Sequence, residues 1–218
     1  RNSINWKQNT YHSKFSQTNS FIASIDENSE EDLFELLFNN GTMKAQFLKY
    51  DPLTDRFYIA GEFDKSISLN GNYHPSKGGL DLFVMSLNKN LYTSNVKTFG
   101  GSGTDRVSAF ELNNDGNLFL SGTFAHSIEL GNDTINSMGD TDSYIASLNP
   151  DTLEIQDTLL LQGLYKDQID AIRIIRSNYL LYGSTIESSL NEVSLHISLL
   201  GDTENKPILL TPFPEKIS

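Results

Sequence analysis

The chain has 218 residues, with 16 Lys and Arg against 28 Asp and Glu, so its formal net charge is −12. An acidic chain is a poor partner for nucleic acid or for an anionic membrane surface, because both are bound through Lys and Arg. It has no cysteine, which excludes disulfides, thiolate nucleophiles and cysteine-based metal sites.

The chain begins at Arg1 and has no charged, then apolar, leader pattern. We expect that a leader has been removed or that the chain is cut from a longer protein. No apolar run approaches the roughly 20 residues that span a bilayer, so we expect no transmembrane segment.

Short apolar runs of period two, interrupted by Asn, Asp, Gly and Ser, predict an all-β chain. The first 41 residues contain expected strands at 20–27 and 33–39, and a further one near Trp6. The expected strands that follow are 43–51, 56–63, 80–88 and 93–101, then 107–113, 118–124, 143–149 and 154–161, then 169–177, 179–186, 192–200 and 206–213.

These strands repeat with a period of 61 residues. Residues 57–88 overlay residues 118–149 without a gap, and 11 of the 32 paired positions are identical. The same shift leads from Ser121-Gly122-Thr123 to Tyr182-Gly183-Ser184. Upstream, residues 20–25 lie about two periods before residues 143–148.

A unit of four antiparallel strands cannot bury both faces alone, and radial stacking of such units solves this in a β-propeller. We therefore expect an all-β propeller of four-stranded antiparallel blades, incomplete at about three and a half blades. The expected division is a partial blade over 1–41 (its last two or three strands), blades over 42–101 and 102–163, and a shorter, degenerate blade over 164–218.

A family resemblance rests on residues 99–149. They contain Phe99-Gly100-Gly101-Ser102-Gly103-Thr104-Asp105, then Asp115-Gly116-Asn117, Phe124 and Gly139-Asp140-Thr141-Asp142. This series resembles the SBBP β-propeller repeat, and the likeness weakens toward both ends of the chain. The chain lacks the Trp usual at the start of the fourth strand, and it has Ser86 and Ser147 where the family often has Lys. The resemblance implies an exported bacterial protein, extracellular or at the outer surface, and no single activity.

Structural roles are expected for the glycine-rich turn. Asp105, matched by Asp167, follows this turn and is expected to bond turn amides. Gly101 and Gly103 are expected to supply unusual φ values.

A metal role is considered for three acids. Asp133, Asp140 and Asp142 are the candidates for Ca²⁺, which prefers oxygen ligands at short spacing. The EF-hand pattern is absent. Asp142 recurs as Asp81 in the other copy, which favours capping of loop amides, and we expect no cofactor.

The candidate contact surface lies on two long polar loops, 64–79 and 125–141, expected to share a face with residues 100–106 and 162–168. Tyr73, His74, Lys77 and Met138 lie near their tips, and surface loops often carry function.

The expected function is a non-catalytic module of an exported bacterial protein, which binds protein or glycan or serves as a scaffold. One alternative is a subunit or fragment of a larger outer-surface assembly, with the remaining blades from the same or a partner chain. Another is a propeller enzyme acting on polysaccharide through acids around the central channel. The innermost strands offer a mixed set without a repeated acid, so no catalytic residue is predicted: Lys44, Gln46, Ser108, Glu111, Asp170 and Arg173.

Overall fold

The computed structural model describes residues 3–7, 9–12, 20–25, 33–37, 41–69, 71–175, 178–186, 193–195 and 199–200. Every regular element in them is a β-strand, and none is a helix. Within this described part, no helix could therefore cross a lipid bilayer. The expectation of an all-β chain is confirmed.

Two complete four-stranded antiparallel sheets form the centre of the molecule. The first unit contains β5 (Met43–Asp51), β6 (Arg56–Phe63), β9 (Asp81–Asn88) and β10 (Thr93–Phe99), paired in the order β5-β6-β9-β10. The second unit contains β11 (Arg106–Leu112), β12 (Leu118–Phe124), β15 (Asp142–Leu148) and β16 (Ile155–Leu161), paired in the equivalent order. The expected strands match these elements within two residues at either end.

An additional hairpin lies between the second and third strands of each unit. It is formed by β7 (Ser66–Leu69) and β8 (Asn72–Pro75) in the first unit, and by β13 (Ser127–Leu130) and β14 (Asp133–Asn136) in the second. Both segments are predicted as loops from the sequence, and this prediction is wrong. Isoleucines at equivalent positions, Ile67 and Ile128, are fully buried and fix each hairpin to the body of the protein.

The N-terminal segment has two separate strand pairs: β1 (Ser3–Trp6) with β2 (Asn9–His12), and β3 (Ser20–Ser24) with β4 (Leu33–Leu37). The strand near Trp6 pairs with β2 and not with β3, so it is not a further strand of the β3–β4 sheet. Its position, about two periods before β13, makes β1–β2 the counterpart of the additional hairpins.

The third unit begins with β17 (Lys166–Ile175) and β18 (Asn178–Ile186). Within the strand expected at 192–200, the described residues form β19 (Val193–Leu195) and β20 (Leu199–Leu200), which both pair with β18. The strand expected at 206–213 lies outside the described residues.

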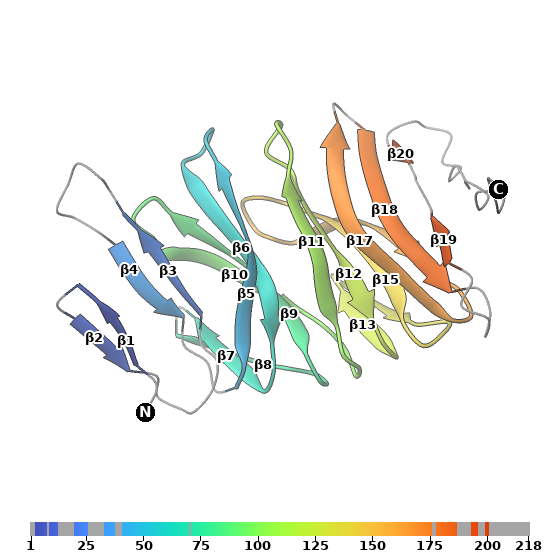
Figure 1. The fold of residues 1–218 in the computed structure, drawn as a ribbon, viewed down its shortest axis with the longest axis horizontal. Coiled ribbons are helices and arrows are strands. Elements are labelled where there is room, and N and C mark those ends of the chain that lie inside the picture. The colour runs from blue at the N-terminus through green and yellow to red at the C-terminus, as the bar shows by residue number, and fades with distance from the viewer. Residues whose placement is uncertain are drawn as a thin grey trace, which may run out of the picture.

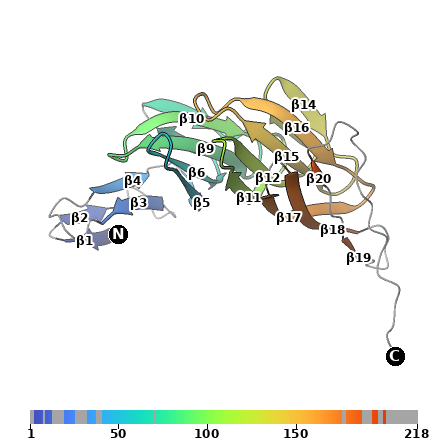
Figure 2. The same cartoon turned by 90° about the horizontal axis from the view of Figure 1, so that it is seen from above.

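The units stand face to face along an arc (Figures 1 and 2). Each complete sheet has its first strand at one edge, and β5, β11 and β17 follow one another on the concave side of the arc in Figure 2. We call these three the inner strands. The hydrophobic cores lie between consecutive units: Tyr58 and Val84 of the first unit pack in one cluster with Phe110 and Tyr144 of the second. Stacking therefore buries the faces that one sheet leaves exposed.

Candidate functional site

A polar groove crosses the boundaries between the three units at the starts of inner strands β11 and β17. It encloses about 330 Å³. The side chains that line it are mostly hydroxyls and amides, with one carboxylate and two cations. They include Gln46, Glu62, Thr104, Arg106, Ser108, Thr123, Thr141, Lys166 and Gln168. We call this site the polar groove.

The groove depends on a β-bulge repeated in every inner strand. The strand register shifts between Ala45 and Phe47, and at the equivalent places in β11 and β17. The additional residues are Gln46, Ser108 and Asp170. A bulge redirects a side chain out of the regular alternation of the strand, and two of these three residues line the groove.

A glycine faces each bulge: Gly61, Gly122 and Gly183. A Cβ atom at Gly122 would lie 1.7 Å from the carbonyl oxygen of Arg106, and one at Gly61 would lie 2.1 Å from that of Lys44. No side chain fits at such distances, so the glycines permit the close approach of the bulged strand. These glycines recur at a spacing of one period, and this spacing is the feature of the sequence that indicates the groove.

Glu62 is the carboxylate of the groove, and the second unit holds it in place. Its side chain is buried. Oε1 accepts a hydrogen bond from the backbone N–H of Val107 at 3.1 Å, and Oε2 lies 3.6 Å from Nη1 of Arg106. Glu62 thus joins two units and orients Arg106 along the groove.

Two buried polar atoms of the groove have no hydrogen-bond partner within the described part of the chain: Oε1 of Gln46 and Oγ1 of Thr141. Buried polar atoms in native proteins are nearly always satisfied by protein, water or ligand. These two atoms, both on groove-lining residues, are suited to bind a group that both donates and accepts hydrogen bonds, such as a hydroxyl.

The contact residues expected on loops lie elsewhere, in and beside the additional hairpins. Tyr73 and Met138 are 66% and 63% exposed. His74 lies beside Tyr73 in β8, and burial lowers the pKa of its imidazole. Lys77 forms an ion pair with Glu129 of the next unit's hairpin. None of these four residues is among those that line the polar groove.

The hydrogen bonds of the glycine-rich turn that precedes Asp105 support a structural role for this turn. The amide of Gly101 donates to Oδ2 of Asp105 at 2.8 Å. The amides of Asp105 and Asp167 donate to the carbonyls of Leu80 and Thr141, at 2.7 and 2.8 Å. These last two hydrogen bonds are equivalent and each crosses a unit boundary.

Unusual φ values are expected at Gly101 and Gly103, and neither residue has a positive φ. A Cβ atom at Gly101 would lie 1.8 Å from the Ser127 carbonyl oxygen, and one at Gly103 would lie 2.0 Å from that of Ala125. The turn uses glycine because it lies against the next hairpin.

The three calcium candidates are not brought together as ligands. Asp133 and Asp140 are exposed, whereas Asp142 is buried. The carboxylate of Asp142 accepts hydrogen bonds from the Met138 amide at 2.6 Å, from Nε2 of Gln162 at 3.2 Å and from the Gly163 amide at 3.3 Å. Asp81 accepts the equivalent bond from the Lys77 amide at 2.7 Å. Both acids thus cap the turn after a hairpin. No group of three metal-ligating side chains occurs among the described residues.

Asp81 and Asp105 are buried at the boundary between the first and second units. Burial raises the pKa of Asp105 to about 7, the charge of Asp81 adds to the rise, and the Gly101 amide opposes it. Burial also raises the pKa of Asp81. Oδ1 of each acid has no hydrogen-bond partner in the described residues, so hydrogen bonds replace only part of the hydration that each charged carboxylate loses on burial.

Of the inner-strand residues considered for catalysis, Gln46 and Ser108 line the polar groove, whereas Lys44, Glu111 and Asp170 are not among its lining residues. Nζ of Lys49 lies 2.9 Å from Oε2 of Glu111, and Nε2 of Gln168 donates to Asp170. The side chain of Arg173 lies outside those described.

No family model matches this chain, and no curated protein matches it. The resemblance to the SBBP repeat stays a prediction.

Proposed function

We propose that this chain is a non-catalytic β-propeller repeat module that binds a polyhydroxylated chain, such as a polysaccharide, in the polar groove. The observation that carries the proposal is the composition of the groove. It is lined mainly by hydroxyl and amide side chains from three consecutive units, and two of its buried polar atoms have no partner among the described residues. Hydroxyls and amides exchange donor and acceptor roles with sugar hydroxyls at little desolvation cost.

The repeat architecture supports the propeller part of this proposal. Antiparallel sheets of a common strand order stack face to face, and their first strands follow one another on one side. Together with the resemblance of residues 99–149 to the SBBP repeat, this favours an exported bacterial protein at the outer surface or in the medium. That these units form part of a closed propeller ring is likewise proposed.

The test is a binding screen against a panel of polysaccharides, followed by calorimetry on the best ligand. Gln168→Ala and Thr123→Val remove hydrogen-bonding groups from the groove, and we expect each to weaken binding about tenfold. Thr158→Val, on β16 and outside the groove, is the matched control and should bind as the parent does. Unchanged binding in both groove variants, or no binding to any polysaccharide, would contradict the proposal.

A second candidate function is protein contact through the additional hairpins. The exposure of Tyr73 and Met138 favours it, because exposed aromatic and Met side chains are common at protein interfaces. Substitution of both residues by Ser should abolish capture of a protein partner and leave polysaccharide binding unchanged.

An assay for cleavage of the bound polysaccharide distinguishes an enzyme from a binding module. In that case the polysaccharide that binds would be cleaved, and Glu62→Gln would abolish cleavage while it retained binding. We expect no cleavage, because Glu62 is already engaged by Val107 and Arg106.

A further inference from the structure

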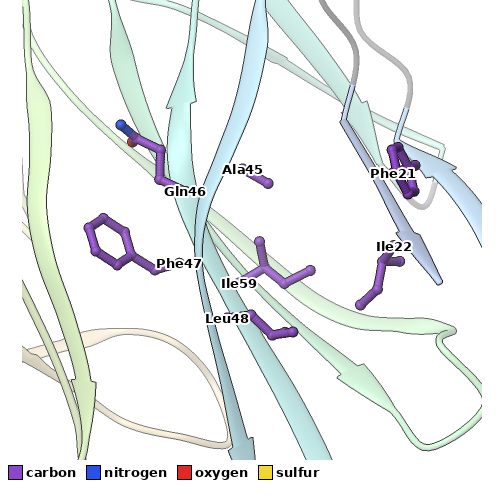
Figure 3. A pocket seen from close by; sticks show the side chains of 7 residues that line it. All are labelled: Phe21, Ile22, Ala45, Gln46, Phe47, Leu48 and Ile59. Atoms are coloured by element: carbon purple, nitrogen blue, oxygen red, sulfur yellow. The ribbon is translucent and has the colours of Figure 1, made fainter. Parts of the chain in front are cut away.

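An apolar surface lies between β3 and β5 (Figure 3). A groove of about 150 Å³ there is lined by one polar residue, Gln46, and by six apolar ones: Phe21, Ile22, Ala45, Phe47, Leu48 and Ile59. Leu48 and Phe21 are 55% and 49% exposed, and Tyr50, further along β5, is also exposed. We call the groove together with the exposed Leu48 and Tyr50 the β5 face.

The repeat provides an internal comparison for this face. Phe110 and Ile172 correspond to Leu48 on the inner strands β11 and β17, because each lies two residues after its bulge. Leu48 is 55% exposed, whereas Phe110 and Ile172 are 1% and 2% exposed. The same position is therefore covered at the two later unit boundaries and exposed at the first.

The cover at the later boundaries comes from the first three strands of the preceding unit: β11 contacts β5, β6 and β9, and β17 contacts β11, β12 and β15. Phe110 belongs to one cluster with Tyr58 and Ala60 of β6, and Phe47 of β5 packs against that cluster. Ile172 packs in a cluster with Ala109 of β11 and Ile145 of β15, and Ala109 corresponds to Phe47, since each directly follows its bulge. At the first boundary β3 corresponds to the third strand, so the elements without a counterpart among the described residues are an inner and a second strand, which pair antiparallel in both complete units.

The strand β3 has the backbone edge to which the second strand of such a pair would bond. Its counterparts β9 and β15 pair on both sides, with β9 bonded to β6 and β15 bonded to β12. Among the described residues, β3 pairs only with β4. An exposed strand edge beside an apolar groove is the arrangement that accepts an added strand.

We infer that the β5 face and the edge of β3 form an acceptor site for an antiparallel strand pair of this same repeat type, which completes the β3–β4 sheet. Its second strand pairs with β3, and its inner strand covers Leu48 and Tyr50. Its chemistry follows from the later boundaries: apolar side chains at the positions of Phe47, Tyr58 and Ala60. The site rests on the repeat architecture and not on polysaccharide binding.

The experiment joins a second copy of residues 42–64, which contains β5 and β6, to the N-terminus of the full chain through a flexible Gly/Ser linker. A tether raises the effective concentration of the added pair and makes its docking intramolecular. We expect a rise in Tm of about 4 °C or more and slower amide hydrogen exchange at residues 20–24.

Two variants and one control make the result specific. Leu48→Lys in the acceptor, or Tyr58→Lys in the added copy alone, should each abolish the gain in Tm and the protection of β3. Leu53→Lys is the matched control, because Leu53 is also strongly exposed but lies in the turn after β5, outside the groove. It should leave both effects intact.

An unchanged Tm and unchanged exchange in the tethered chain would overturn the inference. So would a parent chain that is already a dimer and that Leu48→Lys converts to a monomer, because the occupant would then be a second copy. Loss of polysaccharide binding with tethered docking intact would refute the proposed ligand and leave the acceptor site standing.

Discussion

Ser20 and Ser143, two periods apart, make the same pair of hydrogen bonds across a unit boundary. Oγ of Ser143 donates to the Asp167 carbonyl at 2.9 Å and accepts from the Ile169 amide at 3.1 Å. Oγ of Ser20 lies 3.2 Å from the Met43 carbonyl and 2.8 Å from the Ala45 amide. Each serine thus satisfies backbone groups of the next inner strand beside its bulge, so the boundary is fixed by backbone hydrogen bonding as well as by apolar packing.

Ser143→Ala should therefore destabilise the protein by about 1–3 kcal/mol, because the Asp167 carbonyl and the Ile169 amide each lose a buried partner. The measurement is urea unfolding followed by circular dichroism. Ser121 is an internal control: it is also fully buried in the second unit, yet its Oγ has no hydrogen-bond partner in the described residues. Ser121→Ala should leave the free energy of unfolding unchanged or raise it. Equal losses in the two variants would mean that the boundary hydrogen bonds carry no stability.

The strands of the two complete units could be predicted from sequence because each is a short apolar run between turn residues. Residues 43–51 and 56–63, for example, are both the expected and the observed strands. The hairpin strand Asn72–Pro75 could not be predicted from the sequence, because four polar and aromatic residues ending in Pro give no periodic signal. Its partner strand is held by a single buried isoleucine.

The polar groove could not be predicted for a different reason. Gln46 and Gln168 are two units apart in sequence, and only stacking brings them to one site. The local cause of the groove, a bulge opposite a glycine, appears in the sequence only as Gly61, Gly122 and Gly183 at one-period spacing. A glycine within a strand indicates close approach, but it does not say which side chain the partner strand redirects.

Gly122→Ala tests that close approach. Because the new Cβ would lie 1.7 Å from the Arg106 carbonyl oxygen, β11 would have to move, and we expect a loss of about 3 kcal/mol or more. The reference variant is Gly116→Ala, in the turn between β11 and β12. Nothing lies within 4 Å of its Cβ position, but φ is +83°, so strain of about 1–2 kcal/mol is expected. A loss at Gly122 no larger than that at Gly116 would show that β11 relaxes freely, and groove binding should then persist.

Asp142→Ala tests capping against calcium binding. Removal of the carboxylate leaves the Met138 and Gly163 amides without their acceptor, while Nε2 of Gln162 keeps the Asn136 carbonyl, so we expect a loss of about 2–4 kcal/mol without any added metal. Calcium at millimolar concentration should leave the Tm of the parent unchanged. An increase of several degrees that disappears in Asp142→Ala would instead assign a cation to this turn.

The buried carboxyl at the boundary between the first two units makes stability depend on pH. The folded-state pKa of Asp105 is raised to about 7 from the ordinary value of 3.8. The contribution of this group to stability is therefore fully present below about pH 4 and is lost as pH rises through about 7. Three pKa units correspond to an upper limit of roughly 4 kcal/mol.

The variant Asp105→Asn tests this dependence, because Asn has the same shape, can still accept a hydrogen bond from the Gly101 amide and does not ionise. The difference in unfolding free energy, Asp105→Asn minus parent, should therefore grow in favour of the variant between pH 4 and 7 and be constant above pH 8, with the carboxyls that do not interact with Asp105 cancelling in the subtraction. A difference that is flat over this range would mean that Asp105 is ionised in the folded protein without cost, and that the boundary between these units is open to water.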